Sequence, residues 1–503
     1  MAQEQYVRFE DFSGGLNDTT AAHLLAMNES PDIVNFWPLT QHGALVKRNG
    51  YAKLNTDALD SGPIVGLTKY YKQNGDQWAV AACKNNLYSI TDAGVKADIV
   101  SGTLNGSGKE TFFEVLNDTL YIVNGDSTDL YMKWDGSTAV TSGNATGPVD
   151  GATKIPLRHI FFHPLWGRMF VIGAGSYGSQ VHYSNVMLPE SWQGYEEIAT
   201  DDGDSLVCGC SVSNRVILFK RRSIHAIYGT SPAGMFVTRI YSDYGTEAPR
   251  SVVVDGDQVY FFGTDGMFRV LRGNRPVPIG NAVYATTKTI SKTMRAKVAG
   301  CKYYDYILWS YSDNGSYNNK MLVYDTRTGV WTRFWGISAS CWHTNIGAAD
   351  EYEPLFGGST STSGRVYRFD TGQSDDGSDI YYSWLSKTLS LGAGFPLVTD
   401  LGKIWIWAKA DNTSITWSID ADASARRTGG SFTYAAAGAA YGDGSTYGDG
   451  STYGSADFVK KSAPCNISGT EFRISISGND QKEVVIRKLA LSYRQTYGEG
   501  WAS

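Results

Sequence analysis

The sequence has 503 residues, of which 56 are Gly, 31 Tyr and 14 Trp, and only 19% are charged. A chain of this length is too long for one ordinary core, which predicts several domains or one large radial array. Abundant Gly and aromatic residues favour short strands and tight turns over long helices. Lys and Arg total 44 against 50 Asp and Glu, so the net charge is -6. This charge argues against a protein that grips DNA through its phosphates.

Cysteine usage and hydropathy set further limits. The six cysteines are scattered and do not form the framework of a small disulfide-rich domain. Cys208 and Cys210 would share one face of a strand, but no second pair lies nearby to complete a metal site, and we expect no cofactor. The N-terminus lacks the pattern of a signal peptide, and no apolar run approaches the ~18 residues of a membrane span. We therefore expect no membrane segment and folding in a reducing cytoplasm.

Residues 1–57 are predicted to form an N-terminal arm or platform. A Gly-rich turn follows a short strand near Phe12. Ser30 followed by Pro31 and Asp32 is typical of a helix start, so we expect a short helix over residues 31–36, ended by Pro38. Residues 43–51 are predicted to form a strand that leads into a turn.

Residues 58–380 are predicted to form a β-propeller. In the stretch 251–270, SVVVDGDQVYFFGTDGMFRV, Asp-Gly turns separate short β-branched and aromatic runs, which is typical of an antiparallel meander. Variants of this pattern recur at 85–92, 118–136, 214–229, 319–335 and 364–372. Four-stranded units repeated around a channel define a propeller. There is room for about seven blades of roughly 40–45 residues, and the uneven spacing leaves six to eight open. Residues 174–205 are predicted to be a longer connection.

Residues 381–503 are predicted to form a C-terminal β-sandwich-like domain, which makes the whole chain all-β. Five segments alternate apolar and polar residues, as strands with one wet face do: 388–392, 403–410, 414–422, 472–478 and 484–494. Between them, a Tyr/Gly-rich loop at 441–454 repeats Tyr every six residues, at Tyr441, Tyr447 and Tyr453. This segment is either an exposed loop or an interaction loop whose Tyr side chains dock on a partner.

Chemical motifs are scarce. His159 and His163 are spaced like a zinc pair, but they lack the adjacent Glu and the helix that such a pair needs, so they are expected in the core or on the surface. The segment 324–331 resembles the Asp-box turn of sialidase propellers, in which the carboxylate, here Asp325, braces a hairpin. No nucleophile, acid–base pair or metal cluster can be assigned. We therefore expect no enzymatic activity.

A family resemblance adds to these patterns. FEDFSGGLND (9–18), NESPDIVNFWP (28–38) and GALVKRNGY (43–51) resemble the opening of many phage tail proteins. The segments 182–193, 197–230 and 244–273 resemble the propeller core of the nozzle, or tail tubular protein B-like, proteins of short-tailed phages. The resemblance implies a structural virion protein, assembled in the host cytoplasm, that forms a homo-oligomeric ring, commonly a hexamer. Such a ring contacts other tail proteins (adaptor, fibres or tip) and lets duplex DNA pass without specific binding during ejection.

Two charged clusters are candidate sites in such a ring. The first is acidic and is placed nearest the DNA passage, where it would repel the duplex over a Debye length of ~8 Å in physiological salt; its members are Glu196, Glu197, Asp201, Asp202 and Asp204. The second is a basic patch, more typical of a solvated turn than of a phosphate clamp; its members are Lys220, Arg221 and Arg222. An alternative function stays open, namely a carbohydrate-binding or carbohydrate-cleaving propeller for host-surface recognition.

Overall fold

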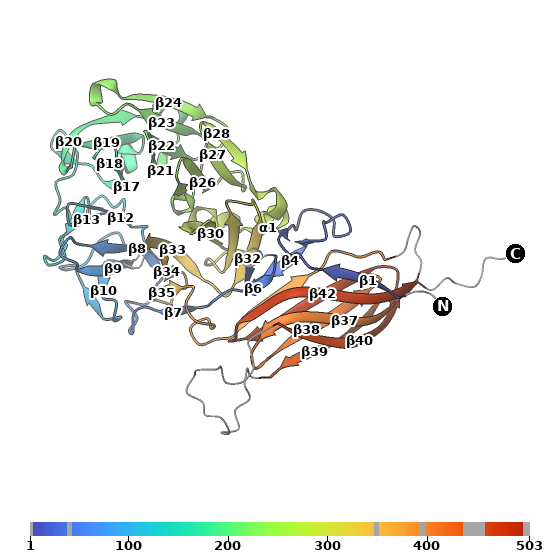
Figure 1. Ribbon diagram of the computed structural model, residues 1–503. Helices are drawn as coiled ribbons and strands as arrows, with labels where there is room; N and C mark the ends of the chain where they lie inside the picture. Colours follow the sequence, from blue (N-terminus) through green and yellow to red (C-terminus); the bar gives the residue numbers. More distant parts are fainter. Residues whose placement is uncertain (1–3, 38–42, 347–351, 392–397, 436–457, 496–503) are drawn as a thin grey trace.

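The computed structural model describes residues 4–37, 43–346, 352–391, 398–435 and 458–495. It contains a β-propeller with a β-sandwich beside it (Figure 1). Strands make up 54% of the chain and helices 6%, which confirms the all-β prediction. Within the described ranges, no helix is both long and apolar enough to cross a membrane.

Seven sheets surround the propeller axis, within the predicted range of six to eight blades. Blade 1 contains β8 (Ile64–Tyr71), β9 (Gln77–Cys83), β10 (Asn86–Ile90) and β11 (Lys96–Asp98); blade 2 contains β12 (Phe112–Leu116), β13 (Thr119–Val123) and β14 (Met132–Trp134). Blade 3 contains β17 (Leu157–His163), β18 (Arg168–Gly173), β19 (Gln180–Asn185) and β20 (Leu188–Glu197); blade 4 contains β21 (Leu206–Val212), β22 (Arg215–Lys220), β23 (Ile224–Tyr228) and β24 (Phe236–Tyr241). Blade 5 contains β25 (Val253–Asp255), β26 (Gln258–Phe262), β27 (Phe268–Arg272) and β28 (Arg275–Pro278). Blade 6 contains β29 (Ala299–Tyr303), β30 (Tyr306–Tyr311), β31 (Lys320–Asp325) and β32 (Trp331–Trp335); blade 7 contains β33 (Ala339–Ile346), β34 (Tyr352–Gly358), β35 (Val366–Phe369) and β7 (Tyr51–Lys53).

The predicted meander at 251–270 is confirmed, because it forms β25, β26 and the start of β27 in blade 5. The predicted connection at 174–205 was wrong. It contains β19 and β20, the two outer strands of blade 3, with an irregular register between them. That irregularity hides the simple alternation by which a strand is recognised in a sequence.

A strand from near the N-terminus closes the propeller. β7 pairs antiparallel with β35, so that Tyr51 lies opposite Phe369. The Tyr51 ring packs edge-on against Phe356 and Tyr367, with ring centroids 5.2 and 5.1 Å apart. The last blade is therefore built from both ends of the propeller sequence, and the ring of blades has no open seam.

The sandwich takes strands from both ends of the chain. One sheet has the order β40-β37-β42-β6-β5, with β1 also paired to β42, and the other contains β4-β36-β41-β38-β39. The strands are β1 (Gln5–Phe9), β4 (Asp32–Val34), β5 (Phe36–Trp37), β6 (Leu45–Lys47), β36 (Ile380–Leu385), β37 (Thr399–Ala410), β38 (Thr413–Ala421), β39 (Arg426–Tyr434), β40 (Val459–Gly469), β41 (Phe472–Asp480) and β42 (Val484–Gln495). Residues 1–57 thus supply strands to the sandwich and to blade 7. Of the segment 388–392, which was expected as a strand, the described residues 388–391 form only an isolated bridge, Leu389 to Phe472.

The remaining elements are short. They are β2 (Gly15–Leu16), β3 (Glu29–Ser30), β15 (Val149–Asp150), β16 (Thr153–Lys154), α1 (Tyr284–Thr289), and the 3-10 turns η1 (Gly175–Tyr177), η2 (Thr200–Asp202), η3 (Pro232–Gly234), η4 (Pro249–Ser251), η5 (Gly280–Val283) and η6 (Lys292–Lys297).

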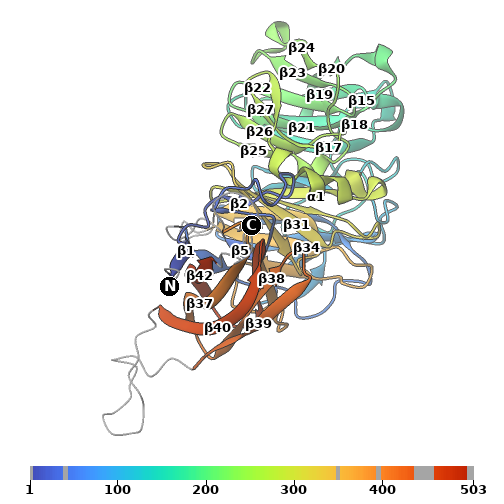
Figure 2. The same cartoon turned by 90° about the vertical axis from the view of Figure 1, so that its right-hand side faces the viewer.

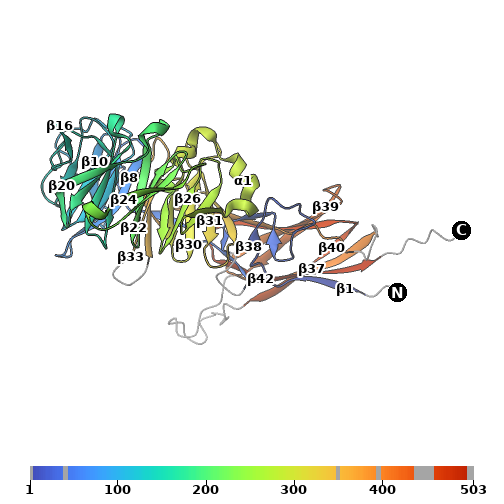
Figure 3. The same ribbon diagram turned by 90° about the horizontal axis from the view of Figure 1, so that it is seen from above.

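Propeller and sandwich share one sheet of nine strands. β32 of blade 6 pairs parallel with β4 through Arg333 and Val34, and β4 pairs with β36 of the sandwich. One hydrophobic cluster runs across this joint and contains Trp331 of blade 6 together with Trp384 of the sandwich. Figures 2 and 3 show the sandwich extending from one side of the propeller at this joint. Continuous hydrogen bonding and a shared core make the two parts one unit.

The helix predicted over residues 31–36 was wrong, because this segment forms β4 and β5. Ile33, Val34 and Phe36 are all fully buried, and β4 is inserted between β32 and β36. Asn35, at φ 58°, separates the two strands. The helix-start signals at Ser30 and Pro31 are local preferences of order 1 kcal/mol, which burial of three large side chains outweighs.

Candidate functional site

The structure brings the acidic cluster and the basic patch together. Lys220 Nζ lies 2.8 Å from Asp202 Oδ1, and the Arg222 backbone N–H donates to Asp204 Oδ2 at 3.0 Å. The Lys220 side chain is fully buried, and its ammonium also donates to the Ala199 carbonyl at 2.8 Å. These residues therefore join blade 3 to blade 4, and Lys220 does not offer a cation to solvent.

The other charged residues are more open. Glu196 and Glu197 end β20, the outermost strand of blade 3. Burial raises the pKa of Glu196, and Glu197 Oε1 accepts from Gln180 Nε2 at 3.2 Å. Asp201 is exposed in η2. In the basic patch, Arg222 is exposed and Arg221 Nη2 lies 3.4 Å from Glu247 Oε2.

The predicted interaction loop, with Tyr441, Tyr447 and Tyr453, lies outside the described residues. The strand before it, β39, ends the nine-stranded sheet. Within the described ranges only β38 pairs with it, and six of its nine residues are exposed, namely Arg426, Arg427, Gly429, Gly430, Ser431 and Thr433. An edge strand of this length is a template for pairing with another chain.

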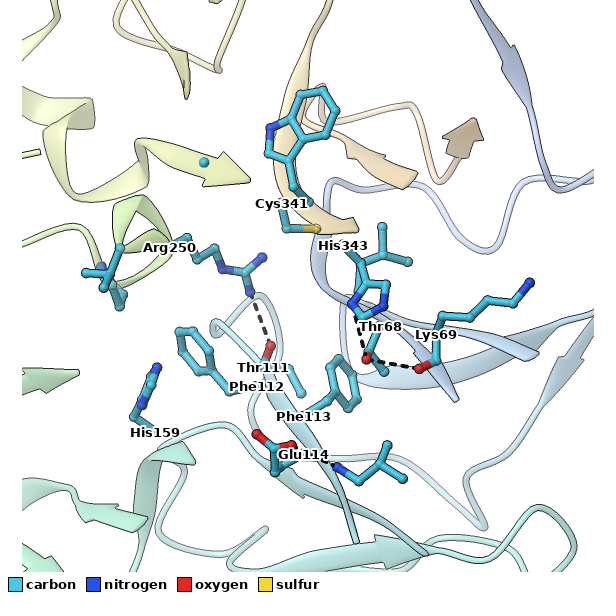
Figure 4. Close-up of a pocket in the computed structure, with 16 residues that line it drawn as sticks. Thr68, Lys69, Thr111, Phe112, Phe113, Glu114, His159, Arg250, Cys341 and His343 are labelled. Carbon is cyan, nitrogen blue, oxygen red and sulfur yellow. Dashed lines mark hydrogen bonds between the residues drawn. The ribbon is translucent and has the colours of Figure 1, made fainter. Parts of the chain in front are cut away.

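A cavity of about 410 Å³ lies in the central channel of the propeller (Figure 4). Inner strands of several blades line it, since Thr68 comes from blade 1, Glu114 from blade 2, His159 from blade 3 and His343 from blade 7. Arg250 enters from η4, just before blade 5. The cavity therefore sits where the blades converge.

Burial controls the ionisation of the channel side chains. It raises the pKa of Glu114 to about 7, although backbone N–H groups of Val115 and Phe162 oppose this shift. It lowers the pKa of His159 to about 3 and that of His343 to about 4. Both histidines are consequently neutral at physiological pH.

A second cavity, of about 460 Å³, lies beside blades 6 and 7. It is lined by the aromatic rings of Tyr303, Tyr304 and Tyr352 and by polar groups that include Glu353 and Arg368. Tyr304 is 44% exposed, and its ring centroid lies 4.7 Å from that of Tyr352. An exposed aromatic face beside carboxylate and guanidinium groups can bind a ligand that is apolar on one face and polar at its edge. We call this cavity the tyrosine groove.

The predicted chemical motifs have structural roles. Asp325 Oδ1 accepts from the backbone N–H groups of Arg327 and Thr328, at 2.8 and 3.1 Å, and so braces the β31–β32 hairpin as predicted. His163 is buried and stacks on Trp166, with centroids 4.1 Å apart. In the part of the chain that the structure describes, no group of three His, Cys, Asp or Glu side chains is arranged to hold a metal.

Sequence reasoning missed the channel residues Glu114 and Arg250. The available signal was positional: the first strand of each repeated unit lies innermost, so its polar side chains face the axis. Glu114 lies in such a strand, within an otherwise apolar run, FFEVL. Arg250 could not be found this way because it lies in a connection before its blade.

Comparison with known proteins finds similar structures but no family. No protein family and no curated protein matches the sequence. Among solved structures, the chain is similar to a streptogramin B lyase, at 11% identity and a TM-score of 0.43, over 63% of this chain and 96% of the lyase. It is also similar to the RRP9 WD40 repeats, at 9% identity and a TM-score of 0.43, over 64% of this chain and 99% of that one. The Neurospora crassa Pan2 WD40 domain is similar at 10% identity and a TM-score of 0.41, over 65% of this chain and 97% of that domain. The fold defines this chain as an all-β propeller protein.

One expectation is corrected by these comparisons. The sequence led us to expect no enzymatic activity, but structures similar to this chain include streptogramin B lyase and the virginiamycin B lyase of Staphylococcus aureus, which are enzymes. The absence of activity therefore does not follow from a propeller without a recognisable motif. At 10–11% identity these likenesses assign no reaction to this chain.

Proposed function

We propose that this chain is a structural subunit of a phage tail, in which copies of it, commonly six, form a nozzle-like ring around the path of DNA ejection. The resemblance of residues 9–51 and 182–273 to tail nozzle proteins motivates this proposal. The observation that supports it best is the shared nine-stranded sheet, which makes propeller and sandwich one unit and ends at β39, whose strand partner among the described residues is β38 alone. In this proposal the subunit resides in the virion and contacts other tail proteins.

The DNA path would run between subunits. The propeller channel holds a cavity of about 410 Å³ and is walled by side chains such as Phe112 and Phe113. B-DNA, whose major groove alone is about 12 Å wide, cannot pass such a channel. A ring of copies is therefore needed to enclose a duplex, and the exposed residues of β39 are the surface that we assign to contact with a second copy.

Electron microscopy of the purified protein tests the proposal directly. Closed rings of uniform copy number are expected, whereas a monomer at all concentrations, also in the presence of its neighbouring tail proteins, would contradict it. Proline substitutions at Thr428, Gly429, Gly430 and Ser431, made one at a time, then test the β39 edge. Successive amides in a strand alternate between pairing with β38 and pointing outward, so the series contains its own control. Loss of rings without loss of the fold is expected where proline removes an outward amide.

The tyrosine groove favours a second candidate function, carbohydrate binding for recognition of a host surface. The exposed Tyr304 ring offers a stacking face, and Arg368 and Glu353 offer hydrogen-bond partners for hydroxyl groups. A glycan array probed with the labelled protein tests this candidate. Binding should be lost in Tyr304→Ala and kept in Tyr381→Ala, a matched control because Tyr381 is 43% exposed elsewhere. If no glycan on the array binds, carbohydrate binding by the tyrosine groove is ruled out.

A further inference from the structure

The central channel contains one carboxylate and one guanidinium that form no ion pair, either with each other or with another described residue. We propose that this channel binds a small zwitterion, an α-amino acid, whose ammonium group is held by Glu114 and whose carboxylate is held by Arg250. This inference is independent of the proposed tail function, because it concerns the inside of a single propeller.

Glu114 provides the anionic end of the site. Among the described residues, its carboxylate accepts only from backbone N–H groups, that of Phe162 at 3.2 Å and that of Val115 at 3.3 Å. No cationic side chain contributes to its ionisation, so burial raises its pKa to about 7. A carboxylate held in this way lacks a counter-ion, and an ammonium group is the ligand that would supply one.

Arg250 provides the cationic end. Its Nη2 donates to the Thr111 carbonyl at 3.2 Å and to the Val65 carbonyl, which fixes the guanidinium at the cavity wall. The guanidinium lies 5.3 Å from the centroid of the Phe112 ring. Its buried Nε has no hydrogen-bond partner in the described part of the chain. A guanidinium with N–H groups to spare suits a carboxylate, which it can bind through two parallel hydrogen bonds.

The side chains between these two ends add polarity without charge. His159 Nδ1 accepts from the Gly209 N–H at 3.5 Å, which leaves the ring proton on Nε2. His159 is 8% exposed, and no described residue accepts from its Nε2; Figure 4 shows the ring at the cavity, beside the ring of Phe112, with centroids 4.6 Å apart. Phe112 and Phe113 provide apolar wall. The volume of about 410 Å³ is at the lower end of the range for small-molecule sites, ~300–1,000 Å³.

Binding should release protons near pH 7. The ammonium group favours the ionised form of Glu114, so the pKa of this carboxyl falls on binding and affinity rises as pH increases through 7. The other titratable and charged groups that face Glu114 are Lys69, Tyr121, Tyr131, His159, Arg250 and His343. Burial moves the pKa values of these tyrosines upward and those of these histidines downward, away from neutrality. The proton released near pH 7 therefore comes from Glu114.

Ligand-observed NMR with an equimolar mixture of the standard amino acids identifies a binder, and calorimetry then measures its affinity. We expect a dissociation constant near or below ~1 mM, and at least a tenfold loss for the analogue that lacks the amine and for the analogue that lacks the carboxylate. Titration at pH 7 in two buffers of different ionisation enthalpy should report proton release. If no amino acid binds, or if either analogue binds as tightly as the amino acid, the zwitterion site is ruled out.

Matched variants separate the site from the fold. Glu114→Gln keeps an acceptor for the Phe162 N–H, and should weaken binding at least tenfold and abolish proton release. Arg250→Gln should weaken binding similarly. The controls are Glu471→Gln in the sandwich and Arg275→Gln in β28, both exposed, which should bind as the wild type does. Circular dichroism checks that each variant folds, and a Glu114→Gln protein that folds and binds with unchanged affinity would contradict the assignment.

Discussion

Arg48 and Asp375 form a buried ion pair at the joint between propeller and sandwich, with Nη1–Oδ1 and Nη2–Oδ2 distances of 2.8 and 2.6 Å. Arg48 also donates to Asn35 Oδ1 at 2.9 Å and to the Trp335 carbonyl at 2.7 Å. The same Asn35 donates to the Tyr381 carbonyl at 2.6 Å. One guanidinium thus ties together β6, the end of blade 6 and the segment that follows blade 7.

We expect Asp375→Asn to be strongly destabilising. The Arg48 side chain is 0% exposed, and loss of its partner leaves a buried charge, which typically costs about 3–5 kcal/mol. Urea unfolding followed by tryptophan fluorescence measures this loss. Lys409→Met is the control, since it breaks an exposed pair with Glu483 and should change stability by less than about 1 kcal/mol. If the two variants lowered the free energy of unfolding equally, the buried Arg48–Asp375 pair would not be important for stability at the joint.

The second prediction concerns the strand β7, which closes the propeller. Tyr51→Ala removes a ring that contacts Phe356 and Tyr367 and a hydroxyl that donates to the Gly336 carbonyl at 3.1 Å. We expect a loss of about 3 kcal/mol, and faster hydrogen exchange confined at first to β7 and β35. Tyr195→Ala, at a side chain that is 51% exposed on β20, should exchange as the wild type does. If amide hydrogen exchange became faster by the same factor in all blades, the contribution of β7 would not be local to blade 7.

Acid should destabilise the protein through its buried histidines. Burial lowers the pKa of His159 to about 3 and those of His182, His225 and His343 to about 4. The unfolded chain takes up these protons below pH ~6.5 whereas the folded chain does not, so stability falls as pH drops from about 6.5 to 4. Each histidine contributes up to about 2 kcal/mol at pH 5.

Melting temperatures measured between pH 7.5 and 5 test this effect. His225→Gln should flatten the pH dependence, because Gln does not titrate in this range. Glu114 acts in the opposite direction: burial raises its pKa from the ordinary 4.5 to about 7, so its contribution to stability falls as pH rises from about 4.5 to 7. A melting temperature that rises on acidification would therefore mean that Glu114 outweighs the histidines, contrary to our expectation.

The repeated strands were predictable because their signals are local. Asp-Gly turns and aromatic alternation predicted the meander of blade 5, and the Asp-box pattern at Asp325 predicted the β31–β32 hairpin of blade 6. The parts that were missed depend on contacts distant in sequence. Val34 becomes a strand residue because it pairs with Arg333 and Ser383, some 300 residues away, and no local pattern encodes that pairing. The cavity residues Glu114 and Arg250 were missed for the same reason, because they come to line one cavity only when the propeller closes.

The last prediction concerns how an acidic protein accommodates DNA. Lys220 is fully buried against Asp202, so the basic patch offers solvent only Arg221 and Arg222. Each phosphate contact contributes about 0.9 to the slope of log affinity against log salt concentration, so the two cations of one subunit allow a slope no steeper than about 2. We expect weak binding of duplex DNA to the unassembled subunit, with Arg221→Gln and Arg222→Gln together removing the salt dependence that this patch contributes. Fluorescence anisotropy with a labelled duplex, at low and physiological salt, measures this. Submicromolar binding with a steep slope that survives both substitutions would overturn the idea of a conduit that repels its cargo, and would place the phosphate contacts on another surface of the ring.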